Sequence, residues 1–391
     1  EKPFSLQIIR KADSEVIFNL DSYLIFKDQY LEFSLLSNNT ERQTYGYGES
    51  ARVSQALEVN RMYTLWAEDL PSMFLSENLY GSLPFGLQQI ASPSSPNYGK
   101  AHGHILLNSN GMDVTLLSDR INYKVLGGII DFYVLVGSSA KKVVQQSTEV
   151  VGKPMMIPYW SLGFHSCKWG YESIQQIEEV VANYSKANIP LDTQWFDIDY
   201  MSEYRDFTLN ETAYEVNEVQ SFISQLHTNG QRLVPIIDPG ILVQAGYEAY
   251  DKGKELDLFI KDLQGNDYIG QVWPGPTHYP DFLHPKAQDY WTEQLTKFHS
   301  LVDYDGLWMD MNEVSNFCNK DGAGQVCANE APETCHSMSS DCCLVCHTID
   351  ETNRFDFPGY HINTFYGRIS GKTLAMSSTQ YGNLSVYNTH N

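Results

Sequence analysis

The sequence feature that most constrains this fold is an alternation of strand and helix patterns that begins near Pro154. Four short apolar runs predict strands, at 162–165, 191–196, 233–237 and 307–309. Between them, stretches with an apolar residue every three or four positions predict helices, at 174–184, 216–226 and about 284–301. Such repetition produces parallel strands with right-handed crossovers, so a (β/α)8 barrel and an open doubly wound sheet both fit.

Acidic residues follow three successive predicted strands. Asp197 and Asp199 follow the second strand, Asp238 follows the third, and Asp310 and Glu313 follow the fourth. Because catalytic groups collect at the carboxyl ends of barrel strands, these positions favour the barrel. No Gly-x-Gly-x-x-Gly turn follows the first strand, which disfavours a dinucleotide-binding sheet.

The stretch 303–317 has two interpretations. Leu307, Trp308 and Met309 predict a short buried strand, and the acids after it could form an ordinary solvated loop. Trp308 and Phe317 flank those acids, however, and a solvated loop has no need of large aromatic side chains. We therefore interpret the stretch as a functional site.

Residues 1–150 predict β structure, because no convincing helical period occurs before Ser139. Alternating runs predict strands at 15–20, 23–36, 105–108, 113–117 and 129–136. Asn110-Gly111 predicts a hairpin turn between two of them, and the whole predicts a β-sandwich. The Pro-punctuated segment 63–85 carries Asp69, and it is either a loop that serves a neighbouring site or a plain surface excursion.

Composition excludes several classes of function. The 26 Lys and Arg against 48 Asp and Glu give a net charge of −22, which repels nucleic acid and anionic membrane surfaces. No apolar run approaches the roughly 18 residues of a spanning helix. We find no metal or phosphate motif and expect no cofactor. The chain opens at Glu1 without a signal-type segment, so we expect a mature or trimmed form.

Six of the seven cysteines lie close together, at Cys318, Cys327, Cys335, Cys342, Cys343 and Cys346. They favour up to three disulfides and an oxidising compartment over the alternative, a zinc site at Cys343-x-x-Cys346-His347. Sequons agree with secretion, at Asn38, Asn183, Asn210 and Asn383. We therefore expect a secreted protein, or one of the lysosomal or vacuolar lumen. The remaining Cys167 is expected to be a free buried thiol.

A pocket rimmed by carboxylates and aromatic residues points toward glycoside chemistry. The motif Trp308-Met309-Asp310-Met311-Asn312-Glu313 resembles the signature of glycoside hydrolase family 31, the family of retaining α-glucosidases. Further blocks are similar to the family and lie in its order, at 78–82, 163–171, 190–201, 272–275 and 279–282.

The resemblance implies an N-terminal β-sandwich domain over residues 1–150, with its loop 63–85 facing the substrate. It implies a catalytic (β/α)8 barrel over 151–391, with a Cys-rich insertion at 318–347. The implied activity is that of a retaining exo-α-glucosidase, which hydrolyses terminal α-linked glucose from malto-oligosaccharides by double displacement.

The resemblance also implies roles for single residues. Asp310 would be the nucleophile, Glu313 would orient or tune it, and Asp197 and Asp69 would bind the sugar. The walls of the sugar subsite would be formed by Trp169, Ile198, Ile236, Trp273, Trp308, Met311 and Phe317. Asp238 matches a buried acid near the pocket floor, which we interpret as structural.

His165 and Cys167 are interpreted as core residues. Phe196 departs from the family, which commonly has Asn there, and we expect it to reshape the pocket edge.

The family's general acid/base Asp belongs to a segment beyond this sequence, as do the Arg and His of the later strands. Only four barrel units are complete, with a fifth strand expected at 373–377. We therefore expect either a processed enzyme, with a second chain that completes the barrel, or a truncated sequence. We expect negligible hydrolysis by this chain alone.

Two alternatives stay open. One is a non-catalytic sugar-binding or scaffold chain. The other is α-xylosidase or transglucosidase specificity within the same family.

Overall fold

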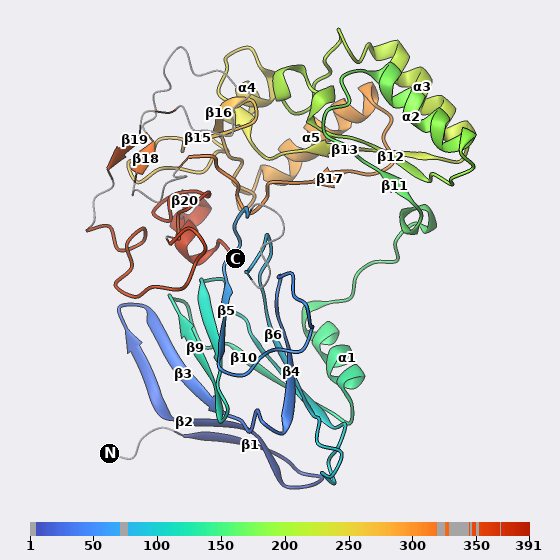
Figure 1. Ribbon diagram of the computed structural model, residues 1–391. Helices are drawn as coiled ribbons and strands as arrows, with labels where there is room; N and C mark the ends of the chain where they lie inside the picture. Colours follow the sequence, from blue (N-terminus) through green and yellow to red (C-terminus); the bar gives the residue numbers. More distant parts are fainter. Residues whose placement is uncertain are drawn as a thin grey trace.

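The computed structural model describes residues 5–70, 77–318, 325–327, 344, 346–348, 352–367 and 369–391. Figure 1 shows two bodies, an antiparallel β-sandwich at the N-terminal end and a parallel sheet with its helices above it. Helix α1 (Ala140–Val151) and an extended segment join them on one side. On the other side, the last residues of the chain lie between the two bodies.

The sandwich consists of two antiparallel sheets, as the alternating pattern predicts. The six-stranded sheet has the order β1-β2-β3-β9-β8-β5, and the four-stranded sheet has the order β10-β7-β6-β4. The strands are β1 (Leu6–Arg10), β2 (Glu15–Lys27), β3 (Tyr30–Leu36), β4 (Arg42–Gly48), β5 (Arg61–Leu65), β6 (Leu83–Ile90), β7 (Ala101–Leu106), β8 (Met112–Leu116), β9 (Arg120–Val125) and β10 (Phe132–Gly137). Phe33, Tyr123 and Leu65 are buried in the core between the sheets.

The single strand predicted at 23–36 is wrong, because the chain reverses within it. Asp28 and Gln29 have φ of +52° and +72°, and Lys27 pairs with Tyr30 across the turn between β2 and β3. Two consecutive residues with positive φ are typical of the tight turns that match strand twist. Neither residue is the glycine or asparagine that would have indicated such a turn.

The hairpin predicted at Asn110-Gly111 is also wrong, because β7 and β8 belong to different sheets. The Asn110 side-chain amide donates to the Tyr387 carbonyl and to Asn388 Oδ1, each at 2.9 Å, so the turn faces the end of the chain. At Gly111 an added Cβ would come within 2.7 Å of the Trp66 ring. The turn therefore connects the sandwich to the second body.

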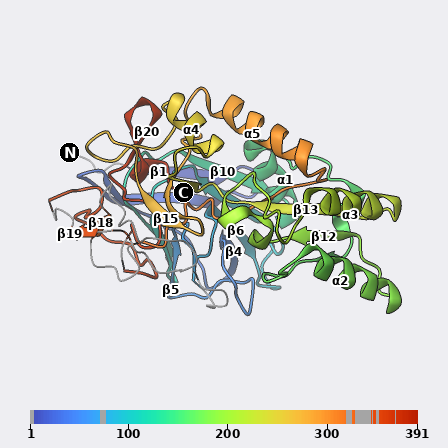
Figure 2. The same ribbon diagram turned by 90° about the horizontal axis from the view of Figure 1, so that it is seen from above.

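The four predicted parallel strands are confirmed as one sheet, in the order β11-β12-β13-β17. They are β11 (His165–Ser166), β12 (Thr193–Phe196), β13 (Arg232–Ile237) and β17 (Trp308–Met309). The predicted helices are confirmed as α2 (Ile174–Lys186), α3 (Val216–Thr228) and α5 (Ala287–Leu301). Figure 2 shows α2 and α3 side by side at one end of the molecule, next to β12 and β13, and α5 along the upper edge. Phe222 and Phe298 bury their rings between these helices and the sheet.

Four features differ from the sequence expectations. Residues 159–162 form a 3-10 turn before β11, and an unpredicted helix α4 (Glu248–Glu255) follows β13. A small antiparallel sheet of β14 (Ile241–Leu242), β16 (Gly275–His278) and β15 (Gly270–Val272) was also not predicted. The expected strand at 373–377 is absent from the described chain. In its place β20 (Thr379–Gln380) pairs with β21 (Leu384–Ser385).

The strand β17 was expected to be buried, but Met309 is 77% exposed. The reason is its position, since β11 and β17 form the two edges of the parallel sheet in the described chain. The sheet is therefore half a barrel with open sides. None of the helices that the structure describes has both the length and the hydropathy needed to cross a membrane.

Candidate active site

Asp310 occupies the carboxyl end of β17, where the chain leaves the sheet in a tight turn. Met311 has φ of +62°, which is uncommon for a residue with a side chain, and its carbonyl accepts the Ser315 N–H at 3.1 Å. The turn holds Asp310 half-buried at the strand end. Burial raises the pKa of Asp310, and the negative charge of Asp69 adds to the effect.

Glu313 follows in the same turn, and nearby negative charges also act on its pKa. Burial raises its pKa to about 7, with further contributions from Asp310, Asp69 and Glu49. Its Oε2 is buried without a hydrogen-bond partner among the described atoms. An acid with these surroundings is partly protonated near neutral pH, so Glu313 can exchange a proton close to Asp310.

Asp197 follows β12 and begins a short 3-10 turn, Ile198–Tyr200. Its Oδ1 accepts the Ile198 N–H at 2.7 Å. Its pKa is raised by burial and then by the charges of Asp199 and Asp310, so Asp197 and Asp310 lie within electrostatic reach of each other. Asp199 accepts the Gly170 N–H at 2.8 Å, which fixes the loop that carries Trp169.

Asp238 lies behind these residues at the end of β13. It is buried, and its N–H donates to Asp206 Oδ1 at 2.9 Å. Burial raises its pKa, and the charges of Asp206, Asp310, Asp197 and Glu313 add to this in that order. Asp238 is therefore a buried acid on which the charges of the other acids act, and its place at a pocket floor stays a prediction.

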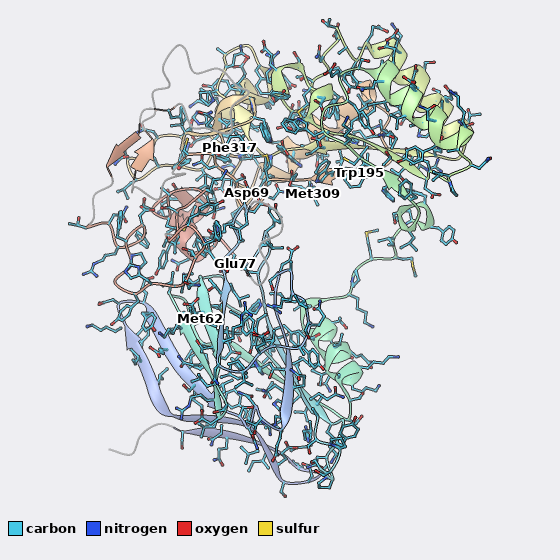
Figure 3. The ribbon with its side chains drawn as sticks, viewed as in Figure 1. Met62, Asp69, Glu77, Trp195, Met309 and Phe317 are labelled. Atoms are coloured by element: carbon cyan, nitrogen blue, oxygen red, sulfur yellow. The ribbon has the colours of Figure 1, made fainter. Side chains whose placement is uncertain are left out.

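Asp69 comes from the sandwich and completes the group. Figure 3 shows it between the two bodies, on the side of Met309 and Phe317. The loop is held by Asn78, whose side-chain amide donates to the Trp66 carbonyl at 2.7 Å. Asp69 therefore lies near the acids of the half-barrel, and the service of segment 63–85 to a sugar site stays a prediction.

Aromatic residues form a cluster that includes Met311, the neighbour of Asp310 in the chain. Trp273 lies 5.9 Å from Trp169 and 4.9 Å from Phe317, measured between ring centroids. Met311 and Val272 pack in the same cluster. Trp169 is 60% exposed, so it forms the outer rim of this wall.

The second part of the wall is Trp308, whose ring lies 5.2 Å from that of Trp195. Ile198 and Ile236 are buried in the core cluster against which Trp273 and Trp308 pack. These isoleucines therefore lie beneath the wall and support it.

Two sequence expectations about this region are wrong. Phe196 packs among Tyr200, Tyr214 and Phe222 on the helix side of β12, so it does not reshape the pocket edge. Cys167 is free but exposed, because the chain at this position has already left β11. His165 fits a structural role, since its Nδ1 accepts the Trp195 indole N–H at 2.9 Å.

Sequence reasoning missed four residues near the acids, which are Glu49, Tyr80, Tyr366 and Lys372. The charges of Asp69, Glu313 and Asp310 add to the effect of burial in raising the pKa of Tyr80. Tyr80 belongs to a block that resembles the family and could have been found there. No local pattern indicates the other three, because tertiary contacts alone bring them to the site.

Within the described residues, no group of three His, Cys, Asp or Glu side chains has the arrangement of a metal site. Cys318 is disulfide-bonded. The strands β18 (Gln325–Cys327) and β19 (Cys346–Thr348) pair with Cys327 opposite Cys346. Most of the insertion 318–347 lies outside the described residues, so the pairing of its cysteines stays a prediction.

The half-barrel and its rim of acids and aromatic residues define the class of (β/α)8-barrel glycosidases. Residues 154–391 match the description "Glycosyl hydrolases family 31 TIM-barrel domain". The chain belongs to glycosyl hydrolase family 31, as the sequence motifs predicted.

Curated relatives match nearly the whole chain. Alpha-xylosidase 1 of Arabidopsis thaliana is 42% identical, over 99% of this chain and 42% of the relative. A probable alpha-glucosidase of Oryza sativa is 39% identical, over 100% and 41%. The lysosomal alpha-glucosidase of Mus musculus is 38% identical, over 100% and 38%. The chain thus spans about two fifths of the length of these relatives.

Solved structures share the fold. The glucosidase II alpha subunit matches with a TM-score of 0.77 at 20% identity, over 97% of this chain and 41% of that one. A family 31 dextranase of Flavobacterium johnsoniae matches with a TM-score of 0.71 at 25% identity, over 80% and 37%. The first of these matches, over 97% of the chain, covers both the sandwich and the half-barrel.

Proposed function

We propose that this chain carries the nucleophile half of a retaining exo-α-glucosidase that removes terminal α-linked glucose from malto-oligosaccharides. The observation that carries the proposal is the position of Asp310. It closes β17 within electrostatic reach of Asp69, Asp197 and Glu313, below a tryptophan wall. Carboxylates that bind hydroxyls and rings that cover the apolar sugar face are what a pyranoside requires.

In the first step an Asp310 carboxylate oxygen attacks the anomeric carbon. The bond from that carbon to the glycosidic oxygen breaks, and a general acid gives its proton to the departing oxygen. In the second step water attacks the same carbon, loses a proton to the same group and releases the Asp310 carboxylate. Two displacements return the original α configuration.

The general acid/base is assigned to the part of the barrel outside this chain. In this proposal the described acids do not serve as the proton donor. Asp197 and Asp69 bind hydroxyls, and Asp238 is buried behind the site. Glu313 lies beside the nucleophile, and its charge modulates that of Asp310. In the completed enzyme the acid/base and Asp310 carboxyl groups should stand about 5–5.5 Å apart, the retaining separation.

The stereochemistry of the first product tests this proposal. Proton NMR of maltose hydrolysis by the complete enzyme should show α-glucose before mutarotation, and β-glucose as first product would exclude a double displacement. Asp310→Asn should lower kcat by at least about a thousandfold, because a neutral amide cannot form the ester. Asp303→Asn is the matched control, since this exposed acid precedes the same strand.

Specificity for α-xylosides is the second candidate, because one of the similar relatives is an α-xylosidase. Xylose lacks the C6 group, so room in the pocket near C6 decides between the two. The ratio of kcat/KM for p-nitrophenyl α-glucoside and α-xyloside measures this directly. A ratio below one would replace glucoside by xyloside in the proposal.

A sugar-binding chain without turnover is the alternative from another class. A binder has no need of a carboxylate at position 310, so binding and turnover should separate in the Asp310→Asn variant. Calorimetry should still detect maltose while hydrolysis is lost. If the wild-type enzyme binds maltose and never cleaves it, the scaffold function is correct.

We propose that the protein works in an oxidising lumen or outside the cell, and that a second chain completes its barrel. The cysteine cluster and the sequons motivate the first part, and the open sheet edges motivate the second. Two bands on a reducing denaturing gel, one of which shifts after N-glycosidase treatment, are expected. A single unshifted band would contradict both parts.

A further inference from the structure

Lys372 lies where the sandwich loop that carries Asp69 meets the rim of the half-barrel. Its Nζ is 3.6 Å from Asp69 Oδ2, and it lies over the Phe317 ring at 5.0 Å from the centroid. The side chain is only 13% exposed, so both contacts are made largely away from water. One cation thus touches an acid from the sandwich and an aromatic residue from the barrel rim.

The backbone of Lys372 is fixed in place by its neighbours. Its φ of +57° lies in the left-handed region, which few residues with a side chain adopt. Its carbonyl accepts the Asn316 N–H at 3.0 Å, and the Asn316 amide donates to the Thr373 carbonyl at 3.2 Å. Asn316 is buried and also accepts the Gln271 N–H at 3.0 Å. The residue that precedes Phe317 therefore also places Lys372.

Two contacts from the same part of the chain hold the Asp69 loop, one at the Glu68 side chain and one at the Asp69 backbone. The Phe365 N–H donates to Glu68 Oε1 at 3.0 Å, and the Tyr366 hydroxyl donates to the Asp69 carbonyl at 2.9 Å. These bonds anchor the loop without touching the Asp69 carboxylate. Within the part of the chain that the structure describes, Lys372 is the residue whose ion pair reaches the Asp69 carboxylate itself.

The Lys372–Asp69 contact affects the electrostatics of the other acids in the site. Among the ion pairs of the described residues, the Lys372–Asp69 pair is the one that reaches an acid of the site. The Asp69 charge adds to burial in raising the pKa of Asp310 and, after the Asp310 charge, that of Glu313. A cation beside Asp69 opposes this effect on both acids.

We propose that Lys372 is a positioning residue of the active site, which fixes the Asp69 carboxylate at the pocket rim and offsets its charge at Asp310. The inference rests on the proposed function, because it takes Asp69 to be a ligand of the bound sugar. Lys372 itself touches no reacting atom. It acts through Asp69, and that dependence can be measured.

The test is a double-mutant cycle of Lys372→Met and Asp69→Asn in the complete enzyme, with an aryl α-glucoside as substrate. Lys372→Met should raise KM about tenfold, the scale of one charge-assisted contact. In the Asp69→Asn background the same substitution should change KM less than twofold. Lys297→Met, which breaks a surface ion pair on α5, is the matched control and should change nothing.

The pH dependence of kcat/KM is a second test, because it would not change if Lys372 had a purely structural role. Among the described residues, the charged or titratable groups around Asp310 and Glu313 include Asp69, Asp197, Asp238, Glu49, Tyr80 and Lys372. Without the Lys372 cation, the acidic limb of kcat/KM should move to higher pH. In the Asp69→Asn enzyme, where Lys372 lacks its counter-charge, the limb should move to lower pH. Lys372→Arg should restore the wild-type limb.

Additive losses in the two backgrounds, or an unchanged acidic limb in Lys372→Met, would overturn the inference. If Lys372→Met folds poorly, Lys372→Gln serves in its place with the same expectations. Failure of the proposed function would be visible separately, as absence of hydrolysis by the wild-type enzyme. Calorimetric titration with glucose would then replace kinetics, and equal affinity of wild type and Lys372→Met would reject the role of Lys372.

Discussion

Replacing Glu313 by glutamine should stabilise the folded protein at neutral pH and leave it unchanged in acid. The structure raises the pKa of Glu313 from 4.5 to about 7, through burial first and then through Asp310, Asp69 and Glu49. At 1.36 kcal/mol per pKa unit, ionised Glu313 costs up to about 3 kcal/mol of folding free energy. Glutamine has the shape of the acid and never ionises, so the variant avoids this cost.

The direction of this pH effect on stability follows from how many protons the folded and unfolded chains bind. Below pH 4.5 both folded and unfolded chains hold the proton, so Glu313 imposes no cost. As the pH rises to about 7 the unfolded chain releases the proton while the folded chain retains it, and stability is lost across that window. Above pH 7 the loss is complete and constant.

Urea unfolding at pH 4, 6 and 8, followed by tryptophan fluorescence, measures the effect. We expect equal midpoints at pH 4 and a higher midpoint for Glu313→Gln at pH 8. Glu293→Gln is the control, because Glu293 is a surface residue paired with Lys297 and should show no gain. Equal midpoints at pH 8, or the same difference at every pH, would refute the electrostatic account of the site.

Three further predictions concern the sandwich and the pocket wall. Gly111→Ala should destabilise the fold by about 1–3 kcal/mol in urea, because the new Cβ would come within 2.7 Å of Trp66, whereas Gly359→Ala meets only the end of a flexible side chain. Burial lowers the pKa of His104 from 6.5 to about 4, so the free energy of unfolding should decrease as the pH is lowered from 6.5 to 4. His104→Phe should remove that part of the decrease, and an unchanged pH dependence of stability in this variant would contradict the prediction. Trp273→Ala should raise KM for maltose about tenfold with a smaller change in kcat, and an effect on kcat alone would show that the ring does not bind ground-state sugar.

The parallel half of the fold was predictable because its signals are local and strong. The apolar stripes of α2 and α3 and the apolar run of β13 each follow one periodicity, and burial between layers enforces it. The turn at Asp28-Gln29 was not predictable in this way, because neither residue type favours positive φ strongly. The Asn110-Gly111 turn was assigned to the wrong partners for a different reason. The Asn110 side chain donates to residues 387 and 388, which no local pattern connects to the turn.

The candidate site shows the same division. Asp197, Asp238, Asp310 and Glu313 were found because each ends or follows a strand, and parallel strands bring their ends together. Asp69 lacked such a signal and depended on family resemblance. Glu49 and Lys372 escaped detection, since they come from a sandwich strand end and an irregular segment that meet the rim only in the folded protein.

The proposed function depends most directly on a covalent bond between the Asp310 carboxylate and the anomeric carbon of the substrate. A 5-fluoro-α-glucosyl fluoride slows breakdown of such an ester, so the complete enzyme can be trapped, digested with pepsin and analysed by tandem mass spectrometry. We expect one labelled peptide, with the sugar on Asp310. A label on any other side chain, or full inactivation without a label, would contradict it.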